Sequence, residues 1–590
     1  MILLLIPSRR WRAWAAWSVV TVASLLLLSD RLYDRWFGDL FPTVAILSAG
    51  HLGQIVGNAW DIASARDAWL MIDVLTAVPL VLALSRRPQD GRAGRYARGA
   101  MALVVGLVLL VAGWKTTSAV KAQPSIVTQR FSNRALVEHT GPLVYHVFDA
   151  GAWIRRTITK ELLTDDLFTD VGAWLARRQP QRAGTGPWFG IASGMNLVVI
   201  QVESLQAQMV DLRINRREVM PNLRKLRSTS VSFSRLFDQT GEGRTSDAEW
   251  MGLTSILPAS HGAAAFIDED NHLVGLPTVL GGRGYQSLSA VAFAPTFWNR
   301  RVMHPKFGFS RSLFSADFSP GEVIGWGLND RDFLLQMVPQ MTFTPAPFAA
   351  WLITQSLHYP FETFPRRLKQ LDVAPWNDTP FGNYVHGMHY FDRALGEFLA
   401  SLNRAGLLAN TVVAVTGDHS AGFPWSRDLA HVLGFSNEML QWHLSERVPL
   451  IISVPGAPPA SVDMPAGQID IAPTLLALLG VDPAGLPYLG RNMLGNPVVE
   501  PVVRRNGGWV DANHLFTMKG NRVGTHCYSL ETFKDVPLED CAKGGAIASQ
   551  QVDVARRIRE FDIQQRLLAE DPAGHRHEIA TRPFRQSSPH

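Results

Sequence analysis

The sequence predicts an α/β protein in which N-terminal transmembrane helices precede an exported domain with a mostly parallel central sheet covered by helices. Apolar runs long enough to span a bilayer lie before residue 115. Beyond residue 190, short apolar runs that end in polar residues alternate with helical patterns, as in parallel sheets with crossover helices. The composition, 47% hydrophobic and 18% charged, fits a membrane part joined to a soluble part.

Three runs predict the membrane spans. They cover residues 11–28, 68–85 and 97–114, and Asp73 interrupts the second. A weaker run, residues 41–56, contains His51 and Gln54 and is more typical of an interfacial or re-entrant piece. The first run is also compatible with a cleaved signal peptide, but no small-residue cleavage site follows it, which favours an anchor.

Arginines predict the orientation of these spans. Arg9, Arg10 and Arg12 precede the first run, and five arginines lie between residues 86 and 98. Positive loops stay in the cytoplasm, so three spans export everything after Trp114. Outside the cytoplasm, Cys527 and Cys541 could form a disulfide, and the alternative is two unrelated thiols.

The formal charge of +5 comes largely from arginines spread along the chain. No basic stripe carries interleaved aromatic residues, which argues against nucleic acid as a partner. A basic surface beside anionic lipid head groups fits better.

Composition predicts five parts of the chain. We expect a transmembrane anchor at 1–118, a connector at 119–190, a catalytic α/β domain at 191–500, a C-terminal part of that domain at 501–570, and a disordered tail at 571–590. Within the connector, residues 151–163 have a helical pattern, whereas residues 176–194 are rich in Gly, Pro and Arg and are typical of a linker.

Strands are predicted at 196–204, 348–361, 410–420 and 446–456, and helices at 386–406 and 469–481. Parallel sheets place their sites at the carboxyl ends of the strands. Glu203, His358, Asp418 and His419 all stand at such ends, so we expect them to gather in one site.

Asp418 and His419 offer a carboxylate oxygen and an imidazole nitrogen, which suit a divalent cation such as Zn²⁺ or Mn²⁺. Glu203 offers a second carboxylate at the end of another strand. Taken singly, each has an ordinary alternative: a turn with a surface histidine, or an exposed strand-end carboxylate.

The stretch QTGEGRTSDAEW, residues 239–250, fails as a nucleotide-binding loop because Arg244 replaces the expected lysine. Ser246 and Glu249 instead fit a helix capping box, which leaves Thr245 at the positive end of the helix. A metal ion could activate the Thr245 hydroxyl for attack on phosphorus. The alternative is a capped helix without chemistry.

Taken together, VIQVESLQ, FDQTGEGRTSDAEW, FWNRR, SLHYPF, HYFDRALGEFL and VTGDHSAGF resemble the lipoteichoic acid synthase-like phosphoglycerol transferases of the alkaline phosphatase and sulfatase superfamily. RVPLIISVPG and DIAPTLLALLG also match. The resemblance covers about residues 190–500. It implies an alkaline phosphatase/sulfatase-like fold, and family members usually carry five membrane spans rather than three.

The resemblance also implies roles. Thr245 matches the nucleophile that becomes glycerophosphorylated. Glu203, Asp418 and His419 match the ligands of one divalent cation, which also contacts the threonine oxygen; Mn²⁺ is expected, with Mg²⁺ or Zn²⁺ as alternatives. His358 matches a substrate-side histidine that donates a proton to the leaving group. Trp298 and Arg300 match residues that hold the phosphoglycerol group. Independently of the resemblance, the guanidinium of Arg300 is suited to bidentate binding of a phosphate.

One departure concerns the stretch SAVAFAPT before FWNR, which lacks the histidine, glycine and acid of the family. The resemblance therefore does not extend to recognition of the acceptor or the head group. The convertible cysteine of sulfatases is absent, and two cysteines are few for a phosphoethanolamine transferase. His386 and His389 are expected to mark the exposed or half-buried face of a helix rather than a metal site, and Asp330 and Asp332 a helix start.

The sequence thus predicts a membrane-anchored, metal-dependent transferase in the bacterial inner membrane, with its catalytic domain facing the periplasm or exterior. Phosphatidylglycerol is the expected donor, and an envelope glycan or lipid is the expected acceptor. The alternatives are a phosphoethanolamine transferase, a phosphodiesterase or sulfatase-type hydrolase, and an inactive envelope scaffold.

Overall fold

The computed structural model describes most of the chain beyond residue 162 and separate helices before it. The described residues are 9–37, 40–41, 64–86, 141–159, 163–260, 262–295, 297–424, 426–435, 439–495, 497–504, 507–518 and 525–570, with isolated positions from 107 to 137. Most of the third predicted span, residues 42–56 of the weak run and the tail 571–590 lie outside them. By internal contacts the chain divides into two units, the first holding residues 1–158, 260–262 and 519–524, and the second holding the rest.

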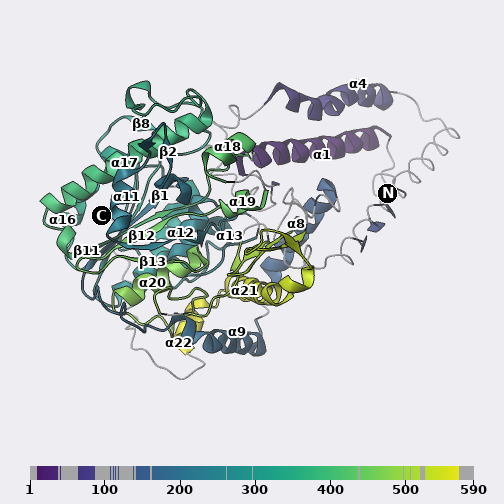
Figure 1. The fold of residues 1–590 in the computed structure, drawn as a ribbon. Helices are drawn as coiled ribbons and strands as arrows, with labels where there is room; N and C mark the ends of the chain where they lie inside the picture. The colour runs from purple at the N-terminus through teal and green to yellow at the C-terminus, as the bar shows by residue number, and fades with distance from the viewer. Residues whose placement is uncertain are drawn as a thin grey trace, which may run out of the picture. The chain divides into compact units, whose positions relative to one another are not determined.

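The first unit is helical where it is described. Its helices are α1 (Arg9–Phe37), the 3-10 helix η3 (Ala65–Met71), α4 (Ile72–Arg86) and α8 (Pro142–Thr159). Helices α1 and α4 lie side by side in both views (Figure 1), and the Trp17 indole donates a hydrogen bond to the Val74 carbonyl at 3.1 Å. Within the described residues, Ala13–Arg35 is the segment long and apolar enough to cross a membrane.

The second predicted span is helical but not continuous. Residues 65–71 form η3, so α4 contributes only 15 residues, and Pro79 lies inside it. The run therefore falls short of a single long apolar α-helix, in contrast to the prediction. The predicted domain boundaries stay predictions.

The second unit is built on an eight-stranded sheet in the order β13-β4-β12-β11-β1-β10-β6-β7. Its strands are β1 (Asn196–Val202), β4 (Val231–Phe233), β6 (Gln286–Val291), β7 (Arg311–Leu313), β10 (Phe348–Ile353), β11 (Thr411–Gly417), β12 (Leu450–Ser453) and β13 (Ala460–Val462). Strands β1, β10 and β11 are buried along their whole length, as expected for parallel strands covered on both faces.

The sheet is mostly parallel, as predicted, with one reversal. Strand β12 pairs antiparallel with both β11 and β4, while the remaining pairs of this sheet are parallel. Strands β6 and β7 were not predicted. They extend the parallel part of the sheet, and the FWNR motif lies in the segment that connects β6 to β7.

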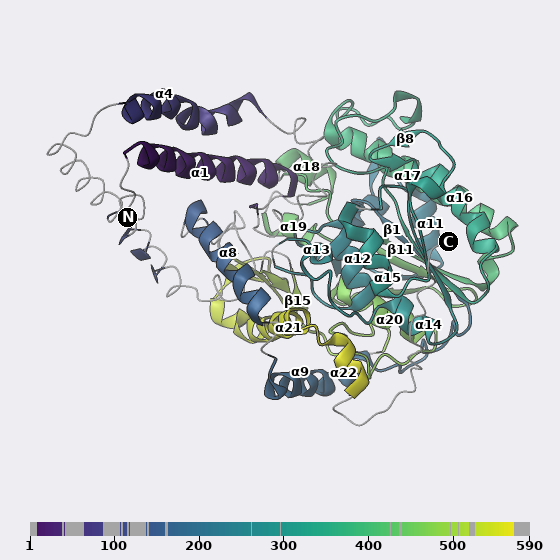
Figure 2. The ribbon, with the colours of Figure 1, turned by 180° about the vertical axis from the view of Figure 1, so that it is seen from behind.

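Helices cover both faces of this sheet, and Figure 2 shows them from behind. They are α11 (Pro221–Ser228), α12 (Thr245–Thr254), α13 (Ala264–Ile267), α14 (Leu276–Gly281), α15 (Arg300–Phe307), α16 (Asp330–Thr342), α17 (Pro380–Arg404), α18 (Arg427–Val432), α19 (Met439–Leu444) and α20 (Ile471–Leu478). Val198 and Ile200 of β1 share a core with α11, α16 and α17. Gln201 faces the opposite side, where α12 lies.

Two helical predictions need correction. Helix α17 begins at Pro380 rather than at 386, because Thr379 caps it by accepting a hydrogen bond from Gly382 N. The predicted linker at 176–194 is partly helical, since α9 (Asp165–Arg177) and α10 (Gln179–Arg182) enter it. The helix predicted at 469–481 is present as the 3-10 turn η10 (Gln468–Asp470) and α20.

A smaller sheet and two helices end the described chain. The sheet runs β15-β16-β17-β18-β19, with strands Val502–Val503, Trp509–Val510, His514–Thr517, His526–Ser529 and Asp535–Val536, and α21 (Ala542–Glu560) and α22 (Gln564–Glu570) follow. Two-stranded pairs elsewhere are β2–β3 (Arg213–Ile214, Arg217–Glu218), β5–β14 (Leu236–Phe237, Ala466–Gly467) and β8–β9 (Val323–Ile324, Gly327–Leu328).

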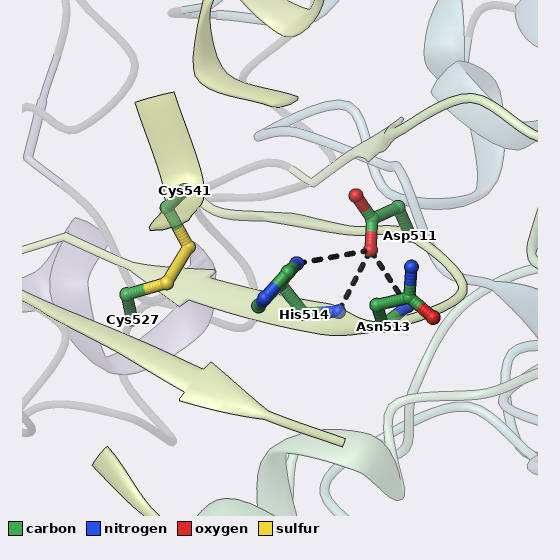
Figure 3. Close-up of a disulfide and its surroundings, with 5 residues drawn as sticks. All are labelled: Asp511, Asn513, His514, Cys527 and Cys541. Atoms are coloured by element: carbon green, nitrogen blue, oxygen red, sulfur yellow. Dashed lines mark hydrogen bonds and ion pairs between the residues drawn. A yellow bond between two sulfur atoms is a disulfide. The ribbon is translucent and has the colours of Figure 1, made fainter. Parts of the chain in front are cut away.

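A disulfide joins Cys527 of β18 to Cys541, the residue before α21 (Figure 3). Of the two alternatives that the sequence left open, a disulfide or two unrelated thiols, the structure therefore has the disulfide. In the neighbouring turn, the Asp511 carboxylate accepts backbone hydrogen bonds from Asn513 and His514 at 2.8 and 2.7 Å. The disulfide links β18 to the segment before α21, and the turn connects β16 to β17, so both stabilise the small sheet.

Replacing both cysteines by serine is expected to lower the free energy of unfolding by about 3 kcal/mol, because the bond closes a short loop in the unfolded chain. Thermal unfolding of the detergent-solubilised protein, followed by tryptophan fluorescence, measures the change. A reductant should lower the midpoint of the wild type to that of the double variant and leave the variant unchanged. Equal midpoints for oxidised wild type and variant would contradict the prediction.

Candidate active site

The ends of β1 and β11 bring three predicted ligands together. The two strands are parallel neighbours with Val202 opposite Gly417, so the residues that follow them, Glu203 and Asp418, lie at the same edge. One ligand atom each of Glu203, Asp418 and His419 lies within 4.8 Å of the other two, and all three side chains are buried. Among the described residues, this is the group of acidic and histidine side chains arranged to hold a metal ion.

The donor atoms of this group fit a divalent cation. Asp418 Oδ1 accepts hydrogen bonds from the backbone N–H groups of Ser204 and His419, each at 2.7 Å. Asp418 Oδ2 is buried and has no hydrogen-bond partner in the described structure. His419 Nδ1 donates to the Ser420 carbonyl at 2.9 Å, which leaves Nε2, 3.3 Å from Glu203 Oε1, as the nitrogen that could bind a metal ion.

The charges of the group favour a cation as well. Burial raises the pKa of Asp418, and the charge of Glu203 raises it further. Burial acts to raise the pKa of Glu203 too, but the fields of His358 and His419 outweigh it and leave that pKa lowered. Two buried carboxylates this close compete for the same compensating charge, which a divalent ion supplies.

Thr245 is the first residue of α12 and reaches the same group. Its Oγ1 donates a hydrogen bond to Glu203 Oε2 at 3.2 Å, and only 2% of the residue is exposed. Arg244 precedes it with a φ of 44°, a left-handed value uncommon outside glycine. The hydroxyl predicted as the nucleophile therefore lies beside a predicted metal ligand at a helix N-terminus.

The predicted capping box is wrong. The helix starts two residues earlier than expected, with Arg244 rather than Ser246 at the N-cap, so Ser246 lies inside it and its Oγ donates to the Gly243 carbonyl at 2.8 Å. Asp247 instead holds the glycine loop, because its Oδ2 accepts the N–H groups of Gly241 and Gly243 at 2.9 and 3.0 Å. A Cβ on Gly243 would stand 2.2 Å from Asp247 Oδ1, which explains the glycine.

Glu249 leaves the cap and becomes a buried counter-ion. Its Oε2 accepts a hydrogen bond from Arg300 Nε at 3.1 Å, and its Oε1 lies 2.7 Å from His304 Nε2. Burial acts to raise the pKa of Glu249, but His304 and Arg300 hold it below its usual value. The terminal nitrogens of Arg300 are buried without a hydrogen-bond partner in the described structure. These two nitrogens form a planar fork that is suited to binding an anion, while Glu249 binds the guanidinium through its Nε atom.

Trp298 and Arg300 belong to a strained turn before and at the start of α15. Trp298 and Asn299 both have a φ of 54°, which two consecutive non-glycine residues rarely adopt. In the described structure, the side chain of Arg300 is bound by Glu249 and makes no hydrogen bond or ion pair with the predicted metal ligands. Their link is α12, which carries Thr245 at its start and Glu249 one turn later.

His358 lies on the loop after β10. Its Nδ1 donates to the Tyr359 carbonyl at 2.8 Å, and the Trp326 ring stacks on it with centroids 3.6 Å apart. Burial lowers the pKa of His358, although Glu203 acts to raise it. The loop is tied down by Asp330, whose Oδ1 accepts the N–H groups of Gln355 and Ser356 at 3.0 Å each.

Asp330 therefore does more than start a helix. It is the first residue of α16, as predicted, yet its side chain is fully buried, and burial raises its pKa to about 6. Asp332 makes the ordinary contact instead, donating its N–H to the Asn329 side chain at 3.0 Å. Neither His386 nor His389 belongs to this group in the described structure. His389 is half-buried, as expected, and its Nδ1 donates to the Val219 carbonyl. His386 is only 2% exposed, which corrects the exposed or half-buried position expected for it.

Gln201 and Trp351 are residues that sequence reasoning missed. Gln201 Nε2 donates to the Thr245 carbonyl at 2.9 Å, and Trp351 Nε1 donates to Gln201 Oε1 at 2.9 Å. Because an indole N–H only donates, it fixes which end of the amide faces Thr245. The available signal was an amide in the otherwise apolar strand NLVVIQV.

Comparison with known proteins gives two family matches. The sulfatase model matches residues 195–481, and the lipoteichoic acid synthase N-terminal domain model matches residues 1–162. Lipoteichoic acid synthase 2 of Bacillus subtilis is 26% identical over 553 residues, which cover 92% of this chain and 82% of that protein. Lipoteichoic acid synthase of Staphylococcus aureus is 27% identical over 502 residues, covering 84% and 76% of the two chains.

Two solved structures share the fold. The lipoteichoic acid synthase LtaP of Listeria monocytogenes superposes with a TM-score of 0.55 at 24% identity, covering 67% of this chain and 97% of that one. A protein of the alkaline phosphatase superfamily from Vibrio parahaemolyticus gives a TM-score of 0.51 at 19% identity, covering 68% and 97%. These likenesses support the α/β fold of the second unit.

Removing one charge from the metal group is expected to abolish tight metal binding. Asp418→Asn keeps the shape but loses a carboxylate, and Mn²⁺ affinity should fall by about 100-fold or more. Titration calorimetry of the purified, metal-stripped protein measures it. The matched control is His389→Gln, which removes a histidine outside the group and should bind Mn²⁺ as the wild type does. Equal loss in both variants would contradict the assignment.

The hydrogen bonds from Trp351 to Gln201 and from Gln201 to the Thr245 carbonyl, called here the Gln201 clamp, are expected to set the position of Thr245. Gln201→Leu removes the donor to the Thr245 carbonyl, and Trp351→Phe removes the donor that orients the amide. Each should lower kcat about tenfold at unchanged KM and metal affinity, because the hydroxyl is displaced while the ligands stay. Trp509→Phe is the control, since the indole nitrogen of Trp509 has no hydrogen-bond partner in the described structure. A change in KM alone would contradict the clamp.

Proposed function

Because the chain belongs to the lipoteichoic acid synthase-like proteins of the alkaline phosphatase and sulfatase superfamily, we propose that it transfers glycerophosphate from phosphatidylglycerol to an envelope glycan or lipid through a covalent Thr245 intermediate. Glycerophosphate transfer is the activity of this family, and the chain is an enzyme of the phosphoglycerol transferase class. The observation that carries the nucleophile is the 3.2 Å hydrogen bond from Thr245 Oγ1 to Glu203 Oε2.

In the first step, Thr245 Oγ1 attacks the phosphorus of phosphatidylglycerol. The Oγ1–P bond forms, the bond from phosphorus to the diacylglycerol oxygen breaks, and diacylglycerol leaves. Glu203 Oε2 accepts the hydrogen bond of the hydroxyl, takes its proton as the Oγ1–P bond forms, and returns it to Thr245 in the second step. His358 supplies a proton to the leaving oxygen.

In the second step, an acceptor hydroxyl attacks the same phosphorus, and the Oγ1–P bond breaks. The lowered pKa of His358 suits this step, because a neutral imidazole can take the acceptor proton. Thr245 recovers its proton, so the enzyme returns to its starting state. The covalent ester divides one displacement into two.

The remaining residues hold charge. A divalent cation bound by Glu203, Asp418 and His419 would lower the pKa of the Thr245 hydroxyl and stabilise negative charge on phosphate oxygens. Mn²⁺ is our proposed ion. Arg300 presents two unpartnered guanidinium nitrogens suited to a phosphate, and Trp298 next to it contributes an apolar wall to the glycerophosphate group.

The membrane part supplies access to the donor. The N-terminal apolar helix and the family support a membrane-anchored protein with an extracellular catalytic domain. We assign the anchor to residues 1–118, the connector to 119–190 and the catalytic domain to 191–500, in the inner membrane of a bacterium with the site facing the periplasm or exterior. The donor then lies in the leaflet beside the enzyme.

Mass spectrometry of the intact protein after incubation with phosphatidylglycerol vesicles and Mn²⁺ tests the proposal. We expect a glycerophosphate adduct on the peptide that contains Thr245. Thr245→Ala should abolish the adduct and lower diacylglycerol release by about 1,000-fold or more, because the nucleophile is lost. Ser246→Ala, which removes the neighbouring hydroxyl, is the matched control and should keep the adduct.

Three outcomes would contradict parts of the proposal. Diacylglycerol release by Thr245→Ala at the wild-type rate would overturn the nucleophile. A phosphoethanolamine adduct formed from a native lipid extract would overturn the donor. Release of free glycerophosphate with no transfer to added glycan or lipid acceptors would make the enzyme a phosphodiesterase.

A further inference from the structure

The first unit is polar between its helices and apolar on its outside. Ser24 and Asp73 hydrogen-bond at 3.1 Å, and Arg35 and Asp67 form an ion pair at 2.6 Å, so the polar side chains of α1 face its neighbours. The exposed side chains of α1 include the large apolar residues Trp11, Val19, Val22 and Leu25, which are 46–66% exposed, beside Ala16, Ser18 and Arg31. This arrangement is the reverse of a water-soluble protein and is that of a membrane-embedded unit.

Helix α8 repeats the reversed arrangement. Among its described side chains, the large exposed ones are apolar: Leu143 is 51% exposed, Val147 74%, Ile154 52% and Ile158 59%. Their spacings of four, seven and four residues place them on one face, called here the α8 stripe. The opposite face carries Tyr145, which is fully buried, and the polar residues His146 and Asp149.

The polar face of α8 is joined to the membrane helix. His146 Nε2 lies 3.1 Å from Asp30 Oδ2, and both side chains are largely buried. Asp30 lies within the segment of α1 that can cross a membrane, near its C-terminal end. Since α8 is held against this end by its polar face, the stripe points away from the protein contact.

We propose that α8 lies in the outer leaflet of an anionic bilayer with the α8 stripe against acyl chains, although it belongs by sequence to the connector. The occupant is lipid because α1, to which α8 is bound, exposes the same kind of apolar surface as a membrane span. The sequence agrees in charge, because its residues 155, 156 and 160 are Arg, Arg and Lys, and basic residues suit anionic head groups. Helix α8 thereby tethers the chain between anchor and catalytic domain to the surface that holds the donor lipid.

The chain is suited to a direct test, because its two cysteines are joined to each other. Val147→Cys and Ile154→Cys, labelled separately with an environment-sensitive thiol dye, place a probe on the stripe of the full-length protein. The labelled proteins are reconstituted in bilayers that contain phosphatidylglycerol. Phe343→Cys is the matched control, because Phe343 is an 86% exposed apolar residue on the catalytic unit.

We expect both stripe probes to emit at shorter wavelength than the control and to be quenched by acyl-chain nitroxide lipids but not by iodide. The control should show the opposite pattern. Quenching of the stripe probes by iodide would place the stripe in water and overturn the proposal. Protection from both quenchers would place it in a protein contact, such as a second copy of this chain, and would overturn it equally.

A kinetic measurement separates this proposal from the proposed reaction. Val147→Glu combined with Ile154→Glu should lower turnover of long-chain phosphatidylglycerol in bilayers by about tenfold, since a charge replaces each acyl-chain contact. Turnover of a short-chain, water-soluble analogue should not change. Equal loss on both substrates would overturn the proposal. If the wild type turned over neither, the proposed function would fail, and the fluorescence result would still decide the place of α8.

Discussion

Two buried carboxylates, Glu203 and Asp418, converge with His419 on one point, and the catalytic unit is arranged around that point. Like charges removed from water repel and lose hydration, so the fold must compensate them. Two backbone N–H groups donate to one oxygen of Asp418, but its other oxygen has no hydrogen-bond partner in the described structure. A divalent cation would complete this balance, and the Thr245 hydroxyl beside it would gain the environment of a nucleophile.

Helix α12 connects the halves of the site. Thr245 begins it, and Glu249, one turn later, holds Arg300 by its Nε atom. At the far end, Gly252 lets the helix approach the Trp351 ring, since a Cβ there would stand 2.8 Å from it. The candidate nucleophile and the counter-ion of Arg300 therefore lie on one helix, and Gln201 fixes the start of that helix against the sheet. Such preorganisation limits motion of the reacting groups.

The sequence predicted the parts that depend on local pattern. Continuous apolar runs mark β1, β10 and β11, because strands covered on both faces tolerate few polar residues. Glu203, Asp418 and His419 could be placed in one site, because parallel strands end at a common edge. The first apolar run is likewise present as a long helix in α1. Strand β12 reads like its neighbours yet runs antiparallel, since an apolar run carries no direction.

By itself, then, the sequence determined the fold class and singled out Glu203, Asp418 and His419 as candidate ligands and Thr245 as the candidate nucleophile, since these follow from periodicity, strand ends and motif chemistry. Tertiary structure alone decided the partners. The sequence position of Glu249 fits a capping box, but in the structure its carboxylate compensates the buried side chains of Arg300 and His304 instead of capping the helix. Gln201 looks like one amide in a strand until Trp351, 150 residues away, fixes its orientation. Contacts between distant segments have no local signature, because they arise only when the sheet brings its strands together.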